Sequence, residues 1–342
     1  MPVMKNAIKF ITFPFLFSFG FMVFLFTKNT INLGYAAFRY LFVLTNGRIN
    51  NRLSYIIGIF KKGKATPANG ILGNLSKAEI EQISAKIVAD GFYEFDVKLD
   101  NELIESITRF ASETGTRYVD VDKKNICYST EKVIFDRSNP ISPRYQFDAS
   151  DIMQNQAVQS LVFDPTLKSV ATAYLNCNPI LDALAMWWSV PFGNKGASQA
   201  AQMFHFDMDR FKFIKFFFYI TDVHSHNGPH CYIQNSHKGL PKAIRKDGRM
   251  TDEELSKIYS KDRFKEFTGK KGTILAVDTR GLHKGKPLKE DVRLLFQIQF
   301  SNSLFGAPFE KINLSGISEL SKKVIRENKR TYQLFSEAHP SK

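Results

Sequence analysis

The chain has 342 residues, of which 44% are hydrophobic and 13% aromatic, so it can bury a sizeable core. Its three cysteines, Cys127, Cys177 and Cys231, lie far apart and indicate neither a disulfide framework nor a zinc knuckle, which fits a reducing compartment. The formal charge of +14 is concentrated in residues 1–78, which hold ten basic and no acidic side chains; the other 264 residues hold 37 basic and 33 acidic ones. Because these 264 residues carry nearly equal numbers of basic and acidic side chains, they are not expected to form a strongly basic surface that binds a nucleic-acid backbone. No nucleic-acid partner is expected.

The N-terminus is a basic and hydrophobic segment. Residues 10–27, FITFPFLFSFGFMVFLFT, are uncharged and lie between Lys9 and Lys28, at the lower limit for crossing a bilayer. Residues 31–60 remain apolar but carry three arginines, which suits a segment lying along a headgroup layer. A cleaved secretory signal is the competing interpretation, although no small-x-small pattern follows, and an ordinary buried helix is another.

We therefore expect residues 1–64 to form a membrane-associating segment, either spanning the bilayer or lying in its plane through residues 1–60. More basic residues follow the apolar stretch than precede it, so the positive-inside rule predicts that the folded domain faces the cytoplasm. The Lys-, Gly- and Pro-containing stretch 61–74 is the expected linker into that domain, which we place at residues 65–342.

Helices are predicted in the first part of this domain. Ser76 and Glu79 form a capping-box pattern for a helix that should run to Asp90, and Asp164 followed by Pro165 predicts another helix start. A strand is expected in GFYEFDV, residues 91–97, and a further helix over residues 101–115.

After residue 183 the sequence consists of short runs of aromatic and β-branched residues separated by turns, which is typical of an all-β core. The expected strands are LAMWWSVPF, AQMFHFDMD, FKFIKFFFYITDV, CYIQNS, GTILAVD and VRLLFQIQFS. Residues 251–267 are predicted to interrupt them as a surface helix with a capping box at Thr251 and Glu254. A short helical tail is expected near residues 316–335.

The strongest chemical signal is His205 with Asp207. Residues two apart on a strand project from the same face, so both side chains can address one ion. His283, just beyond the strand GTILAVD, is the best candidate for a third ligand. Two histidines and one carboxylate leave open positions on the metal, as in non-haem Fe(II) enzymes that bind a co-substrate and dioxygen together.

The strand after His283 has two different faces. Arg293, Gln297, Gln299 and Ser301 point one way, whereas the alternate residues Val292, Leu294, Phe296, Ile298 and Phe300 point the other. The apolar face is expected to pack under helices and the polar face to line a cavity. Arg293 could then clamp a carboxylate in bidentate fashion.

These residues resemble the phytanoyl-CoA dioxygenase family of Fe(II)- and 2-oxoglutarate-dependent oxygenases, over about residues 75–301. The resemblance is carried by QMFHFD, NGPHCYIQNSHKG, and GLHKG followed by Arg293. It implies that His205, Asp207 and His283 bind iron and that Arg293 holds the distal carboxylate of 2-oxoglutarate. Gln234 and Asn235 stand where the family has Pro-Gly; asparagine tolerates a left-handed backbone, so the turn should survive.

The resemblance implies an α+β fold, mainly β, whose core over about residues 183–302 is a double-stranded β-helix, or cupin-like jelly roll. Helices of residues 75–180 and the C-terminal tail would pack on it. Fe(II), 2-oxoglutarate and O2 are the expected cofactors. Gln202 and Lys215 are further candidates for co-substrate binding, although Lys215 could instead extend to the surface.

Other aromatic and histidine residues receive simpler interpretations. His224, His226 and His230 surround an Asn-Gly-Pro turn and are not expected to bind the metal, and His237 is expected to be structural. Trp187 and Trp188 are adjacent on a strand, so one should face the cavity and the other the helices.

The implied reaction is oxidative decarboxylation of 2-oxoglutarate coupled to hydroxylation of a small-molecule substrate. Related halogenases lack the carboxylate ligand, so Asp207 favours hydroxylation. A hydrophobic or lipid-linked substrate is suggested only by the N-terminal segment. The alternatives are a catalytically silent, membrane-tethered binding domain and a cupin-like metalloenzyme that does not use 2-oxoglutarate.

Overall fold

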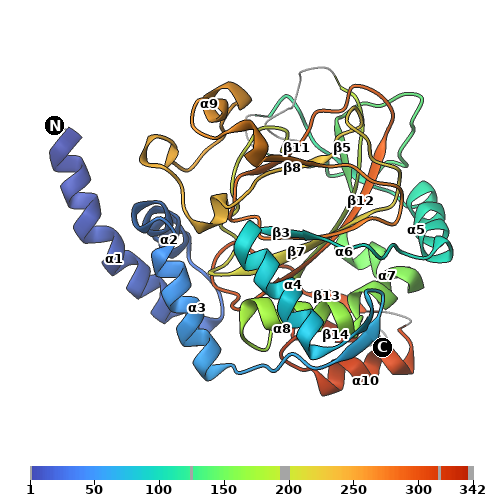
Figure 1. Cartoon of the computed structure of the whole chain (residues 1–342), viewed down its shortest axis with the longest axis horizontal. Helices are drawn as coiled ribbons and strands as arrows, with labels where there is room; N and C mark the ends of the chain where they lie inside the picture. Colours follow the sequence, from blue (N-terminus) through green and yellow to red (C-terminus); the bar gives the residue numbers. More distant parts are fainter. Residues whose placement is uncertain (1, 124–125, 193–200, 315–316, 338–342) are drawn as a thin grey trace.

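Two antiparallel sheets face each other in the computed structural model, which describes residues 2–123, 126–192, 201–314 and 317–337 (Figure 1). The large sheet has the strand order β3 (Phe92–Glu94), β10 (Ile274–Val277), β7 (Phe213–Tyr219), β12 (Arg293–Ser301), β6 (Ile180–Ser189), β5 (Arg144–Gln146) and β4 (Arg117–Tyr118). The small sheet has the order β11 (His283–Gly285), β8 (His230–Ile233) and β9 (Phe264–Phe267). This is the expected jelly-roll core.

The alternation of β12 decides which face of the large sheet is buried under helices. Leu294, Phe296 and Ile298 are fully buried and belong to the core between the sheet and the helical layer. Arg293 and Gln297, on the opposite face, line a cavity between the sheets. The expected division is confirmed for these residues, whereas Gln299 and Ser301 do not line the cavity: the Gln299 amide donates to Asp182 and the Ser301 hydroxyl to the Ser303 carbonyl.

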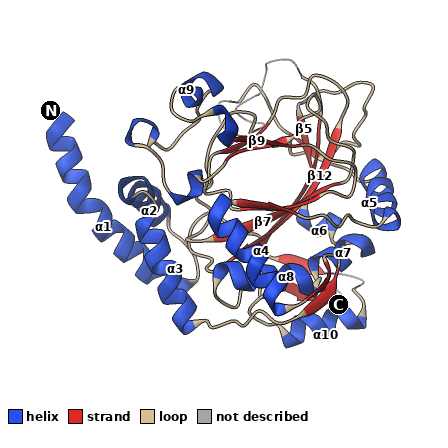
Figure 2. Ribbon diagram, viewed as in Figure 1, coloured by secondary structure: helices blue, strands red, loops and turns tan. Residues whose placement is uncertain are grey.

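A helical layer covers the outer face of the large sheet; Figure 2 shows α4 and α8 on the side of β7 away from the small sheet. It contains α4 (Lys77–Asp90), α5 (Asn101–Glu113), α6 (Ala149–Ile152), α7 (Gln156–Val162) and α8 (Pro165–Leu175). Both expected helix starts are confirmed: Ser76 and Glu79 form a reciprocal capping box, and the Asp164 carboxylate accepts from the backbone N–H groups of Thr166 and Leu167.

The N-terminal residues form three helices that pack against one end of the barrel, at the left edge of Figure 1. They are α1 (Pro2–Thr27), α2 (Asn32–Thr45) and α3 (Arg48–Phe60). Gly20 and Gly34 allow α1 and α2 to touch, because a Cβ atom on Gly20 would lie 2.5 Å from the Gly34 Cα. Phe17 and Phe24 pack on Phe305 with ring centroids 5.6 and 5.4 Å away. Among the described helices, none is at once long and apolar enough to cross a bilayer.

Several segments differ from the sequence expectations. The expected linker contains a hairpin of β1 (Ala68–Gly70) and β2 (Gly73–Leu75). The segment AQMFHFDMD forms no strand and makes only isolated bridges, from Phe204 to Met250 and from His205 to His283. The expected tail helix is shorter, α10 (Glu319–Glu327), and the chain then forms β14 (Phe335–Glu337) beside β13 (Ile312–Leu314).

The predicted helix over residues 251–267 was wrong in its second half. Its capping box is present, but α9 ends after Asp252–Ser256 and is followed by a short 3-10 turn, η3 (Lys261–Arg263), and by β9. The β9 backbone pairs with β8, from Ile233 opposite Phe264 to His230 opposite Phe267. A non-local hydrogen-bond ladder therefore overrides the local helical pattern. Two further 3-10 turns follow β8, η1 (Ser236–Lys238) and η2 (Lys242–Ile244).

Candidate metal centre

His205, Asp207 and His283 converge at the end of the cavity between the sheets. One donor atom from each lies within 4.8 Å of the others, and this is the one such group found among the described residues. Backbone bonds set the arrangement: the His205 N–H donates to the His283 carbonyl at 3.0 Å, and the His283 N–H donates back at 2.8 Å. The two imidazole rings consequently lie 4.4 Å apart between centroids.

Both histidines are oriented to present Nε2 to the same point. His205 Nδ1 lies 2.9 Å from the Met203 carbonyl oxygen and His283 Nδ1 lies 3.0 Å from that of Gly281, so each Nδ1–H donates and each Nε2 keeps its lone pair. Burial, and then the neighbouring His283, lower the pKa of His205 to about 3. Burial also lowers the pKa of His283. Both rings are neutral near pH 7, as metal ligands must be.

Asp207 is ionised. Burial alone would raise its pKa, but the charge of Lys215 and the neighbouring histidines outweigh burial and hold the pKa well below its usual range. Lys215 Nζ lies 2.7 Å from Asp207 and 3.2 Å from Asp209. Lys215 is 9% exposed, so it lies in the cavity wall rather than extending to the surface. A neutral histidine pair with an ionised carboxylate is a donor set that suits Fe(II).

Arg293 lies in the same cavity without a carboxylate partner. Its Nη2 donates to Ser189 Oγ at 3.3 Å, and its buried Nε has no hydrogen-bond partner among the described residues. Burial lowers the pKa of Arg293 to about 10, yet the group remains charged at neutral pH. A buried guanidinium without a carboxylate partner is a suitable binding group for an anion.

The cavity has a volume of about 300 Å³. Its apolar wall includes Trp187, Phe217 and Leu295, whereas Trp188 lies in the core on the helical side and donates to the Ala111 carbonyl. The predicted division of the two tryptophans is therefore confirmed. Gln202 is buried three residues before His205 but does not line this cavity.

His230 is a cavity residue that the sequence interpretation missed. Its ring lies 4.9 Å from that of Phe217 and 5.5 Å from that of His283, and its buried Nε2 has no partner among the described residues. The sequence could have indicated this position, because His230 is the first residue of the strand HCYI. Its side chain therefore projects from the same face of the strand as that of Tyr232. The turn residues His224 and His226 are exposed and lie near Glu290.

The turn that follows β8 keeps its shape despite the missing Pro-Gly. Asn235 has φ +68°, in the left-handed region, and the next residue begins η1. His237 Nε2 lies 3.1 Å from the Val88 carbonyl oxygen, which agrees with its expected structural role. The expectation that asparagine would preserve the turn is confirmed.

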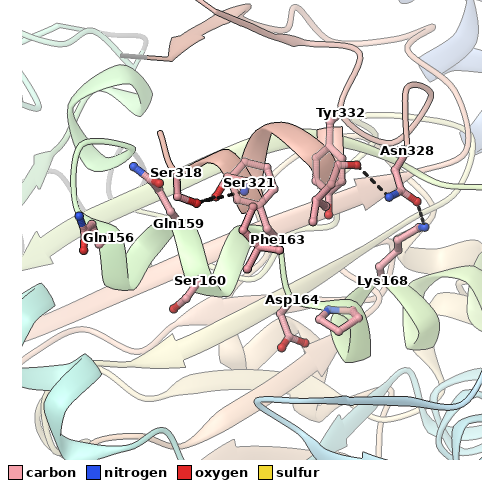
Figure 3. A pocket seen from close by; sticks show the side chains of 13 residues that line it. Gln156, Gln159, Ser160, Phe163, Asp164, Lys168, Ser318, Ser321, Asn328 and Tyr332 are labelled. Carbon is pink, nitrogen blue, oxygen red and sulfur yellow. Dashed lines mark hydrogen bonds between the residues drawn. The ribbon is translucent and has the colours of Figure 1, made fainter. Parts of the chain in front are cut away.

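A larger cavity, of about 670 Å³, lies between α7, α8 and α10 (Figure 3). Its polar groups largely bond to one another: Lys168 donates to Asn328, and Ser318 lies 2.9 Å from Ser321. Asp164 is occupied in capping α8 and in accepting from the Ile71 N–H. This cavity contains none of the triad residues, so the chemistry belongs to the smaller one.

A jelly roll that presents a His-X-Asp pair, a distal histidine and a buried arginine in one cavity has the arrangement of non-haem iron oxygenases that use 2-oxoglutarate. Residues 87–291 match the phytanoyl-CoA dioxygenase (PhyH) family, and the chain belongs to this family. The resemblance seen in the sequence is confirmed. The protein is thus a non-haem iron enzyme of the 2-oxoglutarate-dependent type, with Fe(II), 2-oxoglutarate and O2 as its cofactors.

Two solved structures illustrate the similarity of fold. HygX from Streptomyces hygroscopicus, with nickel and 2-oxoglutarate bound, is 15% identical over 66% of this chain and 88% of its own, with a TM-score of 0.46. The non-haem α-ketoglutarate-dependent carbocyclase SnoK from nogalamycin biosynthesis is 12% identical over 74% of this chain and 93% of its own, with a TM-score of 0.44. No protein of curated function matches this sequence.

Proposed function

We propose that this protein is an Fe(II)- and 2-oxoglutarate-dependent hydroxylase of a small-molecule substrate. In this proposal His205, Asp207 and His283 bind the iron, and Arg293 binds the distal carboxylate of 2-oxoglutarate. Bound iron, 2-oxoglutarate and dioxygen would together supply an oxidant that attacks an unactivated C–H bond.

The observation that carries the proposal is the charge pattern of the cavity. A buried arginine that lacks a carboxylate partner lies in the same cavity as two neutral histidines and an ionised aspartate. A metal site alone would not need this arginine, and a silent binding domain would not need histidines with their Nε2 lone pairs turned toward one point. An iron enzyme with a dicarboxylate co-substrate needs both.

The chain's own residues orient and surround these groups. The carbonyls of Met203 and Gly281 fix the histidine tautomers, and Lys215 keeps Asp207 ionised. Trp187 and Phe217 form an apolar part of the cavity wall. Because Asp207 occupies a ligand position that halogenases leave open, hydroxylation is the favoured outcome.

Anaerobic spectroscopy tests the proposal. Protein loaded with Fe(II) should develop a weak visible absorption band when 2-oxoglutarate is added, because the co-substrate chelates the metal. His283→Ala should lose both the metal and the band. If iron-loaded, folded wild-type protein gives no band, the enzyme does not use 2-oxoglutarate and the cupin-like alternative stands; if it binds no iron, the silent binding domain stands.

A further inference from the structure

The cavity beside the triad is lined by more positive than negative groups. Arg144, Arg249, Arg293 and Lys215 line it, and Asp207 is the one acidic side chain among its described lining residues. Lys215 is paired with Asp207 and Asp209, but none of the three arginines forms an ion pair within the described part of the chain. The residues outside the described ranges include no aspartate or glutamate.

Unpartnered nitrogen atoms also gather in this cavity. Twelve buried side-chain nitrogen and oxygen atoms of the described residues lack a hydrogen-bond partner. Four of them belong to residues that line this one cavity: Arg144 Nε, Arg249 Nη1, Arg293 Nε and His230 Nε2. The arginine atoms can only donate, so the cavity lacks acceptors.

If Arg293 binds the co-substrate, Arg144 and Arg249 remain available to bind another ligand. Arg144 is held in place, since its Nη2 donates to Gln146 Oε1 at 2.7 Å and its guanidinium lies 4.2 Å from the Trp187 ring centroid. Arg249 also lines an adjoining hollow of about 250 Å³ that shares His205 and Asp207. Both guanidinium groups therefore line the cavity of the triad, and neither forms an ion pair within the described part of the chain, although Asp207 and Asp247 contribute negative charge near Arg249.

We propose that the substrate carries an anionic group, a carboxylate or a phosphate, which binds Arg144 and Arg249. This inference rests on the proposed function, because it assigns Arg293 to 2-oxoglutarate. Planar guanidinium groups match both anions geometrically, and a partly buried pair of them gives a larger preference for an anion than a single exposed lysine would.

The tryptophans provide a reporter for the test. Trp188→Phe leaves Trp187, in the cavity wall, as the single tryptophan of the chain. Protein loaded with Mn(II) and 2-oxoglutarate would be titrated with hexyl phosphate, hexanoate and hexanol, following Trp187 fluorescence. We expect the two anions to bind at least about 10-fold more tightly than the alcohol, and Arg144→Gln with Arg249→Gln to remove this preference.

Equal binding of the three probes would overturn the inference, as would an anion preference that survives in the double variant. The result is separable from the proposed function, because the anaerobic iron spectrum does not require a substrate. Loss of 2-oxoglutarate affinity in Arg144→Gln alone would assign Arg144 to the co-substrate and also contradict the inference.

A second surface carries an independent inference. Helix α1 packs on the barrel through Phe17 and Phe24 and presents the opposite stripe to solvent. The residues of this stripe recur at helical spacing and are strongly exposed: Phe15 73%, Phe19 61%, Met22 52% and Phe26 81%. Helix α3 adds a further exposed set, Tyr55 67%, Ile56 47%, Ile59 48% and Phe60 77%.

The charge of this region distinguishes between the possible occupants. Basic residues that form no ion pair with a described side chain accompany the apolar sets: Lys28, Arg48, Arg52, Lys61, Lys62 and Lys64, all exposed. Residues 1–78 contain no acid, so a second copy of this face would bring like charge against like. A lipid layer with an apolar interior and anionic headgroups complements both the exposed apolar side chains and the basic residues.

We infer that α1 and α3 dock in the plane of an anionic membrane surface, with the outer stripe of α1 inserted among the lipids and the basic residues at the headgroups. The catalytic cavity would then be held beside the membrane, and the anionic surface that this face fits is typical of a cytoplasmic leaflet. The inference does not depend on the enzyme's reaction, because no cavity residue takes part in it.

Flotation with vesicles tests the docking face. Full-length protein should float with vesicles of phosphatidylcholine containing about 30% phosphatidylglycerol, and less with phosphatidylcholine alone. Phe19→Ser with Phe26→Ser should lower binding by about 10-fold or more, because two exposed rings no longer insert. Leu320→Ser, which changes a side chain 72% exposed on α10, is the matched control and should bind as the wild type does.

Thermal unfolding of the variants should match that of the wild type, since both phenylalanines face away from the barrel. Absence of binding to either vesicle would overturn the inference, and so would equal binding of the double variant. A dimer in solution that the double variant dissociates would show that the face binds a second copy instead.

Discussion

Lys215, which is buried, and Asp207, which is partly buried, form an ion pair inside the cavity, with Nζ 2.7 Å from Oδ2, although Asp207 is also one of three potential metal ligands. The lysine lies on β7 and the aspartate in the segment before it, and Asp209 contributes a second carboxylate at 3.2 Å. The ammonium group therefore supplies positive charge directly to the Asp207 carboxylate. A divalent ion bound by the triad would share this carboxylate with Lys215.

Replacing Lys215 with Met should destabilise the metal-free protein by about 3 kcal/mol or more, because Asp207 is left as a buried charge without its partner. Mn(II) should then raise the melting temperature more in the variant than in the wild type, since the metal replaces the missing positive charge. Lys215→Arg, which keeps the charge, is the control. An equal metal-induced shift in wild type and Lys215→Met would show that the lysine does not act on the metal site.

Arg293→Ala should weaken 2-oxoglutarate binding by about 30-fold or more, because a charge-assisted bidentate pair contributes about 2 to 4 kcal/mol. Metal binding should persist, since Arg293 contacts none of the triad in the described hydrogen bonds. Calorimetric titration of Mn(II)-loaded protein with 2-oxoglutarate measures the effect. Unchanged affinity would mean that another cation of the cavity, such as Lys215, holds the carboxylate.

His230→Phe preserves the stacked ring beside Phe217 and His283 but removes the unpartnered Nε2. If this atom bonds to the co-substrate, 2-oxoglutarate affinity should fall by about 3- to 10-fold, the range for one neutral hydrogen bond. Metal affinity, measured by equilibrium dialysis, should be unchanged. Loss of metal binding would instead assign His230 to the metal or to the position of His283.

The buried Asp278–Arg280 pair should make the free energy of unfolding depend on pH in the acidic range. Burial alone would raise the pKa of Asp278, but Arg280, whose Nη2 lies 2.6 Å away, lowers it to about 2. The folded carboxyl therefore holds its proton less tightly than the unfolded one. Its contribution is fully present above the unfolded pKa of about 4 and is lost as the pH falls toward 2, by about 2 to 3 kcal/mol.

Urea unfolding of wild type and Asp278→Asn at several pH values measures this contribution. The stability difference between the two proteins should be largest near neutral pH and shrink between about pH 4 and pH 2. A difference that stays constant over this range would mean that Asp278 keeps an ordinary pKa in the folded protein.

The sequence determined the features that depend on local periodicity and capping. The alternation around Arg293 indicated which face of its strand meets a cavity, and the spacing of His205 and Asp207 indicated a shared direction for two donors. Ser76 and Asp164 marked helix starts because each side chain bonds to the backbone a few residues later. Asn235 adopts the left-handed backbone that its position suggested. Each of these depends on neighbours in the chain.

The tertiary structure decided what depends on partners far away in sequence. The strand β9 forms because β8 offers it a hydrogen-bonding edge, against the helical pattern of its own residues. His230 enters the cavity only once β8 pairs with β11, and His205 meets His283 through a backbone bridge rather than a predicted strand. The division of α1 into a buried and an exposed face likewise follows from its contact with Phe305, because an evenly apolar helix carries no local signal for which side will be covered.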